Sequence, residues 1–453
     1  MVTIEKVDTG NKKQVRRFVE LPHRIYADCP QWVPPLNIDA YNQLNRRKHP
    51  FHEHSDVEFF LAVRDGRDVG RLAVIENKPF NKYHNEKKAD FYLFECEDDL
   101  EAATSLFNTA FDWAKARGLN KIVGPKGMGP LDGYGILVFG HEHRQTMTML
   151  NYNHAYYQKL VEAQGFEKEV DFVSCYLPAD QFKIPARVEK IAERVMQRGN
   201  LEVKRFKNKR ELISWADRIG IAYNDAFVNN WEYYPLSPRE IDFFVDNIMT
   251  IDDHRLIKII THGEDVVGFL FAFHDVSAAL QRAKGKLLPF GLPDILLEMR
   301  RTNTVSVNGM GILPEHQGHG GNALLYYAMG RTLLEFNQFV HVEMTQVAET
   351  TDPDTGSFDA DGDGITGGAT SLEHYPRRAT DMSARPYTHH VVDSTDCRYC
   401  HANSANGSAW GGARQISGEE EHNPDWTSAQ CRGCHGDVAN TDFHDALLRI
   451  PDD

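Results

Sequence analysis

The C-terminal part of the chain lacks lysine. Residues 352–453 contain none, whereas residues 1–351 contain 21. These last 102 residues also carry 18 Asp and Glu against seven Arg, and only nine Ile, Leu and Val. Such an acidic segment with so few aliphatic side chains cannot build an apolar core on its own. We expect it to be irregular, either disordered or dependent on a cofactor, and to come from a different kind of protein, as in a chimera.

Other absences narrow the class of protein. No run of about 18 apolar residues is present, so the sequence predicts no membrane-spanning helix. Residues 1–7 have no basic region followed by an apolar stretch, so they do not read as a secretory signal. The net charge of −15 argues against a general nucleic-acid-binding protein. We expect a cytoplasmic protein with no nucleic-acid and no membrane partner, of open oligomeric state.

Residues 1–351 contain an internal repeat. Residues 59–77 and 255–275 each read as an apolar run, a polar turn containing glycine, and a second apolar run. This pattern is typical of a β-hairpin. Gly70 and Gly268 occupy the same place in the two copies. The repeat predicts two related lobes of α/β class, each with a mixed sheet.

The residues after each hairpin predict further matching elements. In the first copy we expect a helix, a strand, a helix and a closing strand, over 100–117, 121–124, 153–164 and 172–177. In the second copy we expect a strand, a helix and a strand, over 304–313, 323–336 and 340–345.

A glycine-rich segment separates the strand at 304–313 from the helix at 323–336. A strand, a glycine-rich loop and a helix N-terminus in this order can bind phosphate, because free main-chain N–H groups and the positive end of the helix dipole face the anion. The same order also suits a plain strand-to-helix turn. The candidate phosphate ligands are Gln317, Gly318, His319, Gly320, Gly321 and Asn322.

This segment resembles the acyl-CoA pyrophosphate loop of the GNAT acetyltransferase superfamily. The family pattern is Gln or Arg, two residues, Gly, one residue, then Gly or Ala. The last position here is Asn322, a departure, with Ala323 one place late. The resemblance implies acetyl-CoA or another acyl-CoA as cofactor. It also implies that the preceding strand, residues 309–313, splays from its neighbour and binds the pantetheine arm, with Gly311, Ile312 and Leu313 as the candidate residues.

The first copy resembles the other end of a GNAT domain. Residues 153–160, followed by Gly165 and Phe166, are similar to the closing helix and strand, with two extra residues before Gly165. That helix often carries a tyrosine that protonates the departing thiolate, which makes Tyr157 a candidate. Residues 95–99, Glu-Cys-Glu-Asp-Asp, stand where the phosphate loop would be, and their carboxylates would repel a pyrophosphate. We therefore expect a degenerate first lobe and an acyl-CoA-binding second lobe.

The sequence does not identify the catalytic base by spacing. Glu343, His341 and Glu315 could each act as the base, and Glu343 is our candidate. A base must lie within hydrogen-bond reach of the amine, and the sequence gives no such geometry. The glycine-rich segment 124–135 either lines a substrate groove or forms a structural crossover.

The second copy is shorter than the first. From Gly70 to Leu177 is 107 residues, whereas from Gly268 to Thr351 is 83. The difference is about the size of the closing helix and strand. We therefore expect three domains, namely a degenerate lobe at 1–178, a truncated acyl-CoA-binding lobe at 179–351, and the acidic tail at 352–453.

The tail contains two pentapeptides of the form Cys-x-x-Cys-His. Two thiols three residues apart can add to the vinyl groups of haem, and the adjacent histidine can then bind the iron. The motifs resemble those of multihaem c-type cytochromes and imply two haems, with four spare histidines nearby. The four cysteines would also suit a zinc site. The predicted haem ligands are Cys397, Cys400, His401, Cys431, Cys434 and His435.

The tail also contains alternating carboxylates followed by glycine. Asp359, Asp361 and Asp363 suit an oxygen-ligand calcium loop, although Thr370 stands where an EF-hand would need Glu. Asp-Gly repeats are equally common in solvated linkers.

The resemblance implies a GNAT-type N-acyltransferase that transfers an acyl group to the amine of a small molecule or peptide, impaired if the second lobe is truncated. An electron-transfer module formed by the tail and a non-catalytic CoA-binding scaffold are the alternatives. The two parts of the chain suit different compartments. Haem c is attached outside the bacterial cytoplasm, so the tail motifs suit a periplasmic or extracellular protein, whereas we expect residues 1–351 in the cytoplasm.

Overall fold

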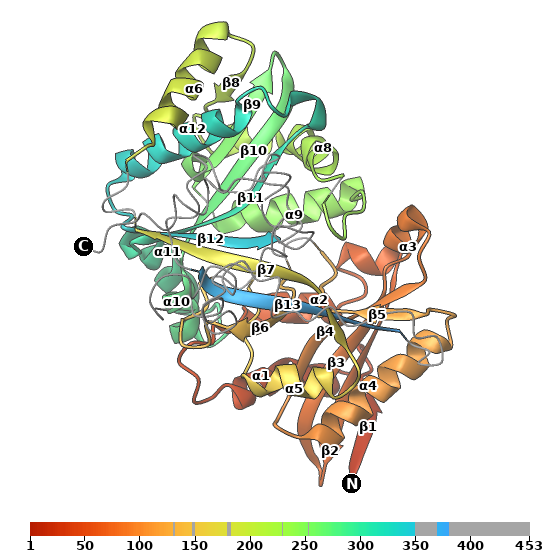
Figure 1. Ribbon diagram of the computed structural model, residues 1–453. Helices are drawn as coiled ribbons and strands as arrows, with labels where there is room; N and C mark the ends of the chain where they lie inside the picture. Colours follow the sequence, from red (N-terminus) through yellow and green to blue (C-terminus); the bar gives the residue numbers. More distant parts are fainter. Residues whose placement is uncertain are drawn as a thin grey trace, which may run out of the picture. The chain divides into compact units, whose positions relative to one another are not determined.

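The computed structural model describes residues 1–129, 132–146, 150–178, 183–228, 230–251, 253–348 and 369–379. Met1–Met382 form one compact unit. Its strands follow the order β1-β2-β3-β4-β5-β13-β7-β12-β11-β10-β9-β8, with β6 paired to β13 (Figure 1). The expected α/β class with two lobes is confirmed.

The first lobe contains the strands β1 to β6 and the helices α1 to α5. Its strands are β1 Val2–Lys6, β2 Asp56–Arg64, β3 Arg67–Glu76, β4 Lys88–Cys96, β5 Lys121–Val123 and β6 Ile136–Phe139. Its helices are α1 Lys12–Ile25, α2 Asn37–Leu44, the 3-10 helix η1 Pro50–Glu53, α3 Lys78–His84, α4 Leu100–Lys115 and α5 Tyr156–Glu162.

The second lobe repeats much of this order, with a first strand, helices, a hairpin, a third strand of the sheet, a long helix and a last strand. Its strands are β8 Glu202–Lys204, β9 Ile257–His262, β10 Asp265–His274, β11 Thr304–Ile312 and β12 His341–Ala348. Its helices are α6 Ala186–Arg198, α7 Lys209–Ile213, α8 Ala216–Ala226, α9 Pro238–Ile251, α10 Ser277–Ala283, α11 Gly291–Arg301 and α12 Gly321–Phe336, with the 3-10 turns η2 His254–Leu256 and η3 Pro314–His316.

Glycine positions confirm the repeat at the level of register. Gly70 of β3 pairs with Cys96 at the end of β4, and Gly268 of β10 pairs with Ile312 at the end of β11. A Cβ on either glycine would lie 2.9 Å from a neighbouring side-chain carbon, so close packing excludes a side chain at both places. Equivalent glycines therefore mark equivalent points of the two lobes.

Each lobe buries apolar side chains on both faces of its sheet, and one helix covers much of the face described next. Helix α4 buries one side, including Leu106, Phe107 and Ala110, against the first-lobe sheet. Helix α12 buries Leu324, Leu325 and Met329 with α6 and the second-lobe sheet. The expected helix at 153–164 begins three residues late, because the Asn153 side chain bonds Leu137 N–H and C=O and holds that residue in the loop.

The closing strand of the first copy does not close the first lobe. Strand β7, Glu167–Pro178, pairs antiparallel with β12 of the second lobe and on its other side with β13, Ala369–Ala379. Strand β13 in turn pairs with β5. This corrects the expected closure, and it leaves β12 with a strand on each side.

A buried group of charges also joins the two lobes. Glu232, between α8 and α9, bonds the Nζ of Lys126 at 2.9 Å and that of Lys88. The Nζ of Lys88, a side chain 1% exposed, lies 3.2 Å from Oδ1 of Asp90. Burial raises the pKa of Glu232, but the two ammonium groups outweigh it and bring this pKa to about 2. The carboxylate is therefore charged and ties β4 and the 126 segment to the second lobe.

Among the described residues, no helix is long and apolar enough to cross a membrane. That part of the chain also holds no group of three or more His, Cys, Asp or Glu side chains arranged to bind a metal ion.

Candidate functional site

The glycine-rich segment forms the turn between β11 and α12. Gly318 and Gly320 have φ of +74° and +83°, values that favour glycine. Gly320 caps α12, so no side chain bonds the first N–H groups of this helix. The first N–H groups of any helix have no partner within it. The start of α12 therefore offers unshared donors and a positive dipole end to an anion.

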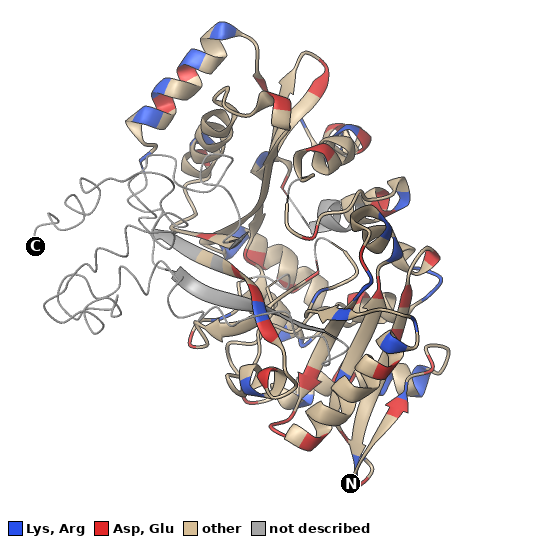
Figure 2. Cartoon of the chain, turned by 45° about the vertical axis from the view of Figure 1, so that its right-hand side comes forward, with Lys and Arg blue, Asp and Glu red and all other residues tan. Residues whose placement is uncertain are grey.

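Neighbouring side chains hold this turn in place. The Gln317 Nε2 donates to Ile312 O at 3.1 Å, which ties the loop to the end of β11. A Cβ on Gly320 would lie 2.8 Å from Val195 and 3.1 Å from Ile191 of α6. Helix α6 also exposes Lys190 and Arg194 next to these contact residues in the sequence, and Figure 2 shows both basic and acidic residues along the helix, four basic against two acidic. The loop thus lies against a helix that carries positive charge.

Strands β11 and β12 separate beyond their first four pairs. They run parallel from Thr304 with His341 to Val307 with Met344, and β12 then pairs with β7 alone. Strand β11 continues to Ile312 beside β10, with Gly309 at φ +93° opposite an irregularity in that pairing. The part of β11 that leads to α12 therefore has an open edge toward β12, as the resemblance implied.

The register decides which main-chain groups face this edge. Leu313 N–H bonds Val267 O of β10 at 2.9 Å, so Leu313 and Gly311 direct their polar groups toward β10. Ile312 and Met310 then direct theirs toward β12, and Ile312 O accepts the Gln317 bond there. Met310 was not named by the sequence analysis. Strand alternation could have found it once the register was known.

Glu343 lies on β12 beside this opening. It pairs in register with Ser306, and both side chains are buried at 9% and 0% exposure. Glu343 also lines a small cavity of about 30 Å³ with residues of the first lobe, including Arg144, Asn151 and Tyr152. A cavity of this size can mark where an amine head meets Glu343 but cannot house a whole substrate. The other candidate bases, His341 and Glu315, do not line it.

First-lobe residues next to this cavity are anchored by the second lobe. Arg144 forms an ion pair with Asp275, and Thr146 O accepts from Ser277 Oγ at 2.6 Å. Burial raises the pKa of Asp275, although Arg144 opposes this. The sequence analysis missed Arg144, because its partner lies 131 residues away along the chain.

The matching place in the first lobe is closed. Only residues 97–99 join β4 to α4, whereas residues 313–320 join β11 to α12. The Asp99 side chain caps α4 by accepting from Ala102 N and pairs with Arg64, so the helix N-terminus already holds a carboxylate. A pyrophosphate would meet this charge, which supports the expected degeneracy of the first lobe.

Tyr157 lies in the sealed core of the first lobe. It is 1% exposed, donates to Glu95 Oε2 at 2.7 Å and accepts from Cys96 N at 3.0 Å. Tyr26 donates to the same carboxylate at 2.6 Å. Burial raises the pKa of Glu95, and burial also raises the pKa of Tyr157 well above its usual value. This placement favours a structural role for Tyr157, and its role as thiolate acid stays a prediction.

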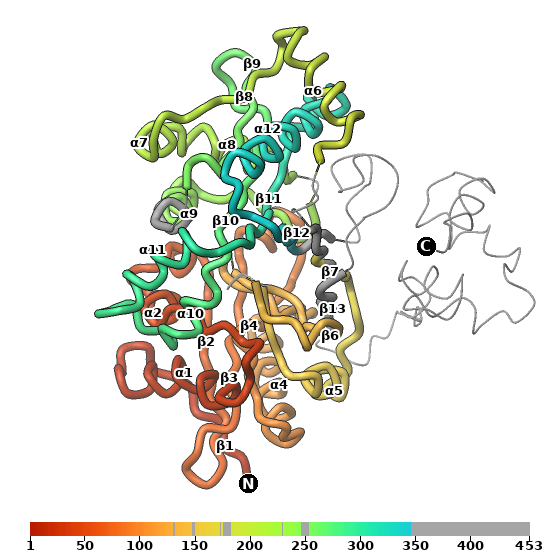
Figure 3. Tube along the Cα trace, turned by 90° about the vertical axis from the view of Figure 1, so that its left-hand side faces the viewer, coloured from red at the N-terminus to blue at the C-terminus, as the bar shows by residue number. Residues whose placement is uncertain are grey.

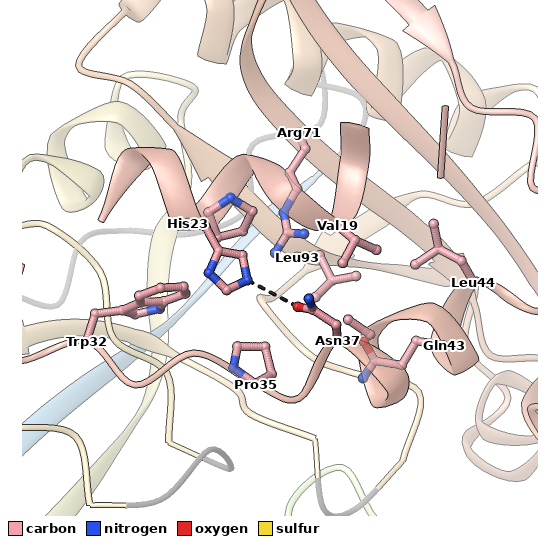
Figure 4. Close-up of a pocket in the computed structure, with 11 residues that line it drawn as sticks. Val19, His23, Trp32, Pro35, Asn37, Gln43, Leu44, Arg71 and Leu93 are labelled. Atoms are coloured by element: carbon pink, nitrogen blue, oxygen red, sulfur yellow. Dashed lines mark hydrogen bonds between the residues drawn. The ribbon is translucent and has the colours of Figure 1, made fainter. Parts of the chain in front are cut away.

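A second small cavity, also about 30 Å³, lies between α1, α2 and the sheet of the first lobe (Figure 4). His23 bonds Asn37 Oδ1 there at 3.2 Å, and the buried Arg71 has no partner for its Nε. The volume suits one water molecule, which could satisfy that donor.

The glycine-rich segment 124–135 forms part of the first lobe. Lys126 N bonds Phe91 O at 2.9 Å, and a Cβ on Gly124 would lie 2.4 Å from that oxygen. The segment packs directly on β4, which favours the structural crossover. The predicted haem and calcium ligands, Cys397, Cys400, His401, Cys431, Cys434, His435, Asp359, Asp361 and Asp363, lie outside the described residues.

Comparison with known proteins gives two curated relatives. A bacterial ceramide synthase of Caulobacter vibrioides is 28% identical over 328 residues, which is 70% of this chain and 82% of that protein. Protein YghO of Escherichia coli is 23% identical over 309 residues, which is 68% of this chain and 78% of that protein. No family model matches the chain.

Solved structures have a backbone fold similar to that of this chain, at low sequence identity. A tandem GNAT protein from the clavulanic acid biosynthesis pathway has a TM-score of 0.48 and 10% identity, covering 86% of this chain and all of that chain. The GCN5-related glucosamine N-acetyltransferase region of a fungal β-N-acetylglucosaminidase has a TM-score of 0.49 and 10% identity, covering 83% of this chain and 38% of that chain.

Proposed function

We propose that this chain is an acyl-CoA-dependent N-acyltransferase of GNAT type, with the acyl-CoA site in the second lobe. The observation that carries the proposal is the open edge of β11, which leads through the loop of residues 313–320 to the start of α12, where no side chain bonds the first N–H groups. Such an edge followed by such a helix suits an extended thioester with a pyrophosphate at one end, because the helix N-terminus favours the anion. The matching place in the first lobe is closed by Asp99.

The residues beside this edge supply the groups that the reaction needs. A neutral amine attacks the thioester carbonyl, the C–N bond forms, and the C–S bond breaks to release CoA thiolate. Glu343 accepts the proton of the attacking amine, directly or through one water. Main-chain groups of Met310 hold the pantetheine arm, and a main-chain N–H at the Gly309 irregularity polarises the thioester carbonyl. The thiolate acid is not assigned to a residue.

The acceptor is an amine that carries a long apolar chain. The support is the name of the Caulobacter relative, because ceramide is an N-acylated long-chain amino alcohol. The amine head would reach Glu343 through the opening lined by Arg144 and Tyr152.

Turnover with matched substrates tests the proposal. The full chain is incubated with acetyl-CoA or palmitoyl-CoA and with sphinganine, hexadecylamine or a lysine peptide, and amide products are measured by mass spectrometry. We expect amide from a long-chain amine and none from the peptide. Binding of acyl-CoA without amide from any acceptor would favour the scaffold alternative. An absorption band near 410 nm in the purified chain would favour the cytochrome alternative, for which the two Cys-x-x-Cys-His motifs are the support.

A further inference from the structure

Large apolar side chains are exposed together in one part of the second lobe. Residues 277–301 form the helices α10 and α11 between β10 and β11. Five large apolar side chains within ten residues are exposed by 39% to 82%: Leu288, Phe290, Leu292, Leu296 and Leu297. The other exposed large apolar side chains of the described residues are scattered over the sequence. Scattered exposure is ordinary, whereas a cluster indicates an interaction surface.

Helix α11 presents three of these side chains, Leu292, Leu296 and Leu297, on one face, and Leu288 and Phe290 precede the helix. Ile295 points inward and packs with Val33, Ala279 and Leu280. Helical spacing places Leu292, Leu296 and Leu297 on the opposite side from Asp294 and Glu298. Those two acids both bond Arg282 of α10, so the negative charge of the segment is already paired. The side of α11 that carries Leu292, Leu296 and Leu297 therefore faces solvent, because Ile295 lies on the side that packs inward.

The charge around this face is positive. Residues 277–301 contain five Lys and Arg against two acids, whereas the whole chain has a net charge of −15. Lys284, Lys286, Arg300 and Arg301 are exposed, and the described part of the chain holds no ion-pair partner for any of them. An apolar face that ends in unpaired basic side chains complements a surface with acyl chains below and anionic headgroups above.

The segment is held firmly against both lobes. Gln281 Nε2 donates to Pro30 O at 2.7 Å and to Trp32 O at 2.9 Å. Asn37 N bonds Gly285 O at 2.8 Å. The α10–α11 segment lies at an edge of the described unit in Figure 3. A rigid apolar projection of this kind can enter a membrane surface without first losing much conformational freedom.

We propose that residues 284–301 dock this protein onto the surface of a membrane that contains anionic lipids. Leu288 and Phe290 enter the boundary between headgroups and acyl chains, and Lys284, Lys286 and Arg300 bind phosphate groups. This replaces the expectation of no membrane partner, which considered spanning helices alone. The proposal does not depend on the proposed function.

Vesicle sedimentation of the full chain tests this proposal. The probes are vesicles of phosphatidylcholine alone and vesicles with phosphatidylglycerol added. The parent should sediment with the anionic vesicles, and less so in high salt. The double variant Leu288→Ser/Phe290→Ser should lose about tenfold or more in affinity, since it removes two large apolar side chains from the bilayer. Ile221→Ser, at an apolar position 60% exposed on α8, is the matched control and should bind like the parent.

Two results would overturn the proposal. One is a parent that sediments with neither kind of vesicle. The other is a parent that forms a dimer in solution, whose double variant is monomeric and retains full vesicle binding, because a second copy would then be the occupant of this face. Circular dichroism of each variant shows whether it keeps the parent fold.

Discussion

At the scale of single residues, a substitution of Asn322 can test the proposed acyl-CoA binding without disturbing the fold. It is half-buried in the first turn of α12. Gly320, by contrast, cannot accept a side chain without displacing α6, so Gly320→Glu would change fold and binding together.

Asn322→Glu should weaken acyl-CoA binding about tenfold or more, because a carboxylate at this helix N-terminus repels pyrophosphate. The same carboxylate favours the helix dipole, so the melting temperature should stay the same or rise. Calorimetric titration with acetyl-CoA measures the affinity, with Asn322→Gln as control. An unchanged affinity in the Glu variant would show that the start of α12 does not bind the pyrophosphate of acyl-CoA.

Glu343→Gln should lower kcat about 100-fold or more with little change in acyl-CoA affinity, since a general base contributes about 10²–10⁴ in rate. Glu315→Gln, an exposed residue before the loop, should retain parent activity. A Glu343→Gln enzyme with parent kcat would show that another group accepts the proton.

Tyr157→Phe should destabilise the protein by about 1–3 kcal/mol, because the Cys96 N–H and the buried Glu95 carboxylate each lose a partner. Urea denaturation measures this loss, and kcat should change little. A variant of parent stability with a large loss of kcat would instead support the thiolate-acid role.

At the scale of elements, the sequence predicted most strands and helices but not their partners. The hairpins, α4, β11, α12 and β12 follow from local periodicity and glycine positions. The pairing of β7 with β12 does not follow in this way, because no local feature of either sequence identifies the other strand as its partner. The α10–α11 segment was likewise missed, since its exposed leucines look like core residues until the fold shows which face is covered.

Two truncations test the role of β13. A chain that ends at residue 351 lacks β13 and leaves the edges of β5 and β7 unpaired, so it should aggregate and melt earlier than the full chain. A chain that ends at residue 382 keeps the compact unit and should melt like the full chain. Equal melting of the two truncations would show that β13 contributes nothing to stability.

At the scale of the whole molecule, the charges around Glu232 tie one lobe to the other. The small cavity at Glu343, where we propose that the amine binds, is lined partly by first-lobe residues, so the relative placement of the lobes matters to the proposed reaction. Sequence analysis could not find this group, because Lys88, Lys126 and Glu232 are far apart along the chain and each is ordinary in its own context.

Glu232→Gln should destabilise the protein by about 3–5 kcal/mol at pH 7, because two buried ammonium groups lose their carboxylate. The pKa of Glu232 is lowered in the fold from 4.5 to about 2, so its contribution is complete above pH 4.5 and is lost as pH falls toward 2. Urea denaturation between pH 4.5 and pH 2 should show that the free energy of unfolding falls less with decreasing pH in the variant than in the parent. Glu264→Gln, whose partner Arg218 is exposed, should change stability by less than about 0.5 kcal/mol.

The pairing of β7 with β12 of the second lobe has a consequence for synthesis of the chain. Val173 of β7 pairs with Val347 of β12, which is made 174 residues later. At about 5–20 residues per second, a ribosome needs roughly 9–35 s to cover this distance. During that time β7 has left the ribosome without its partner, exposed as an unpaired strand. The first half of the chain therefore cannot finish folding on its own, and a chaperone that shields β7 during translation should raise the yield of native protein.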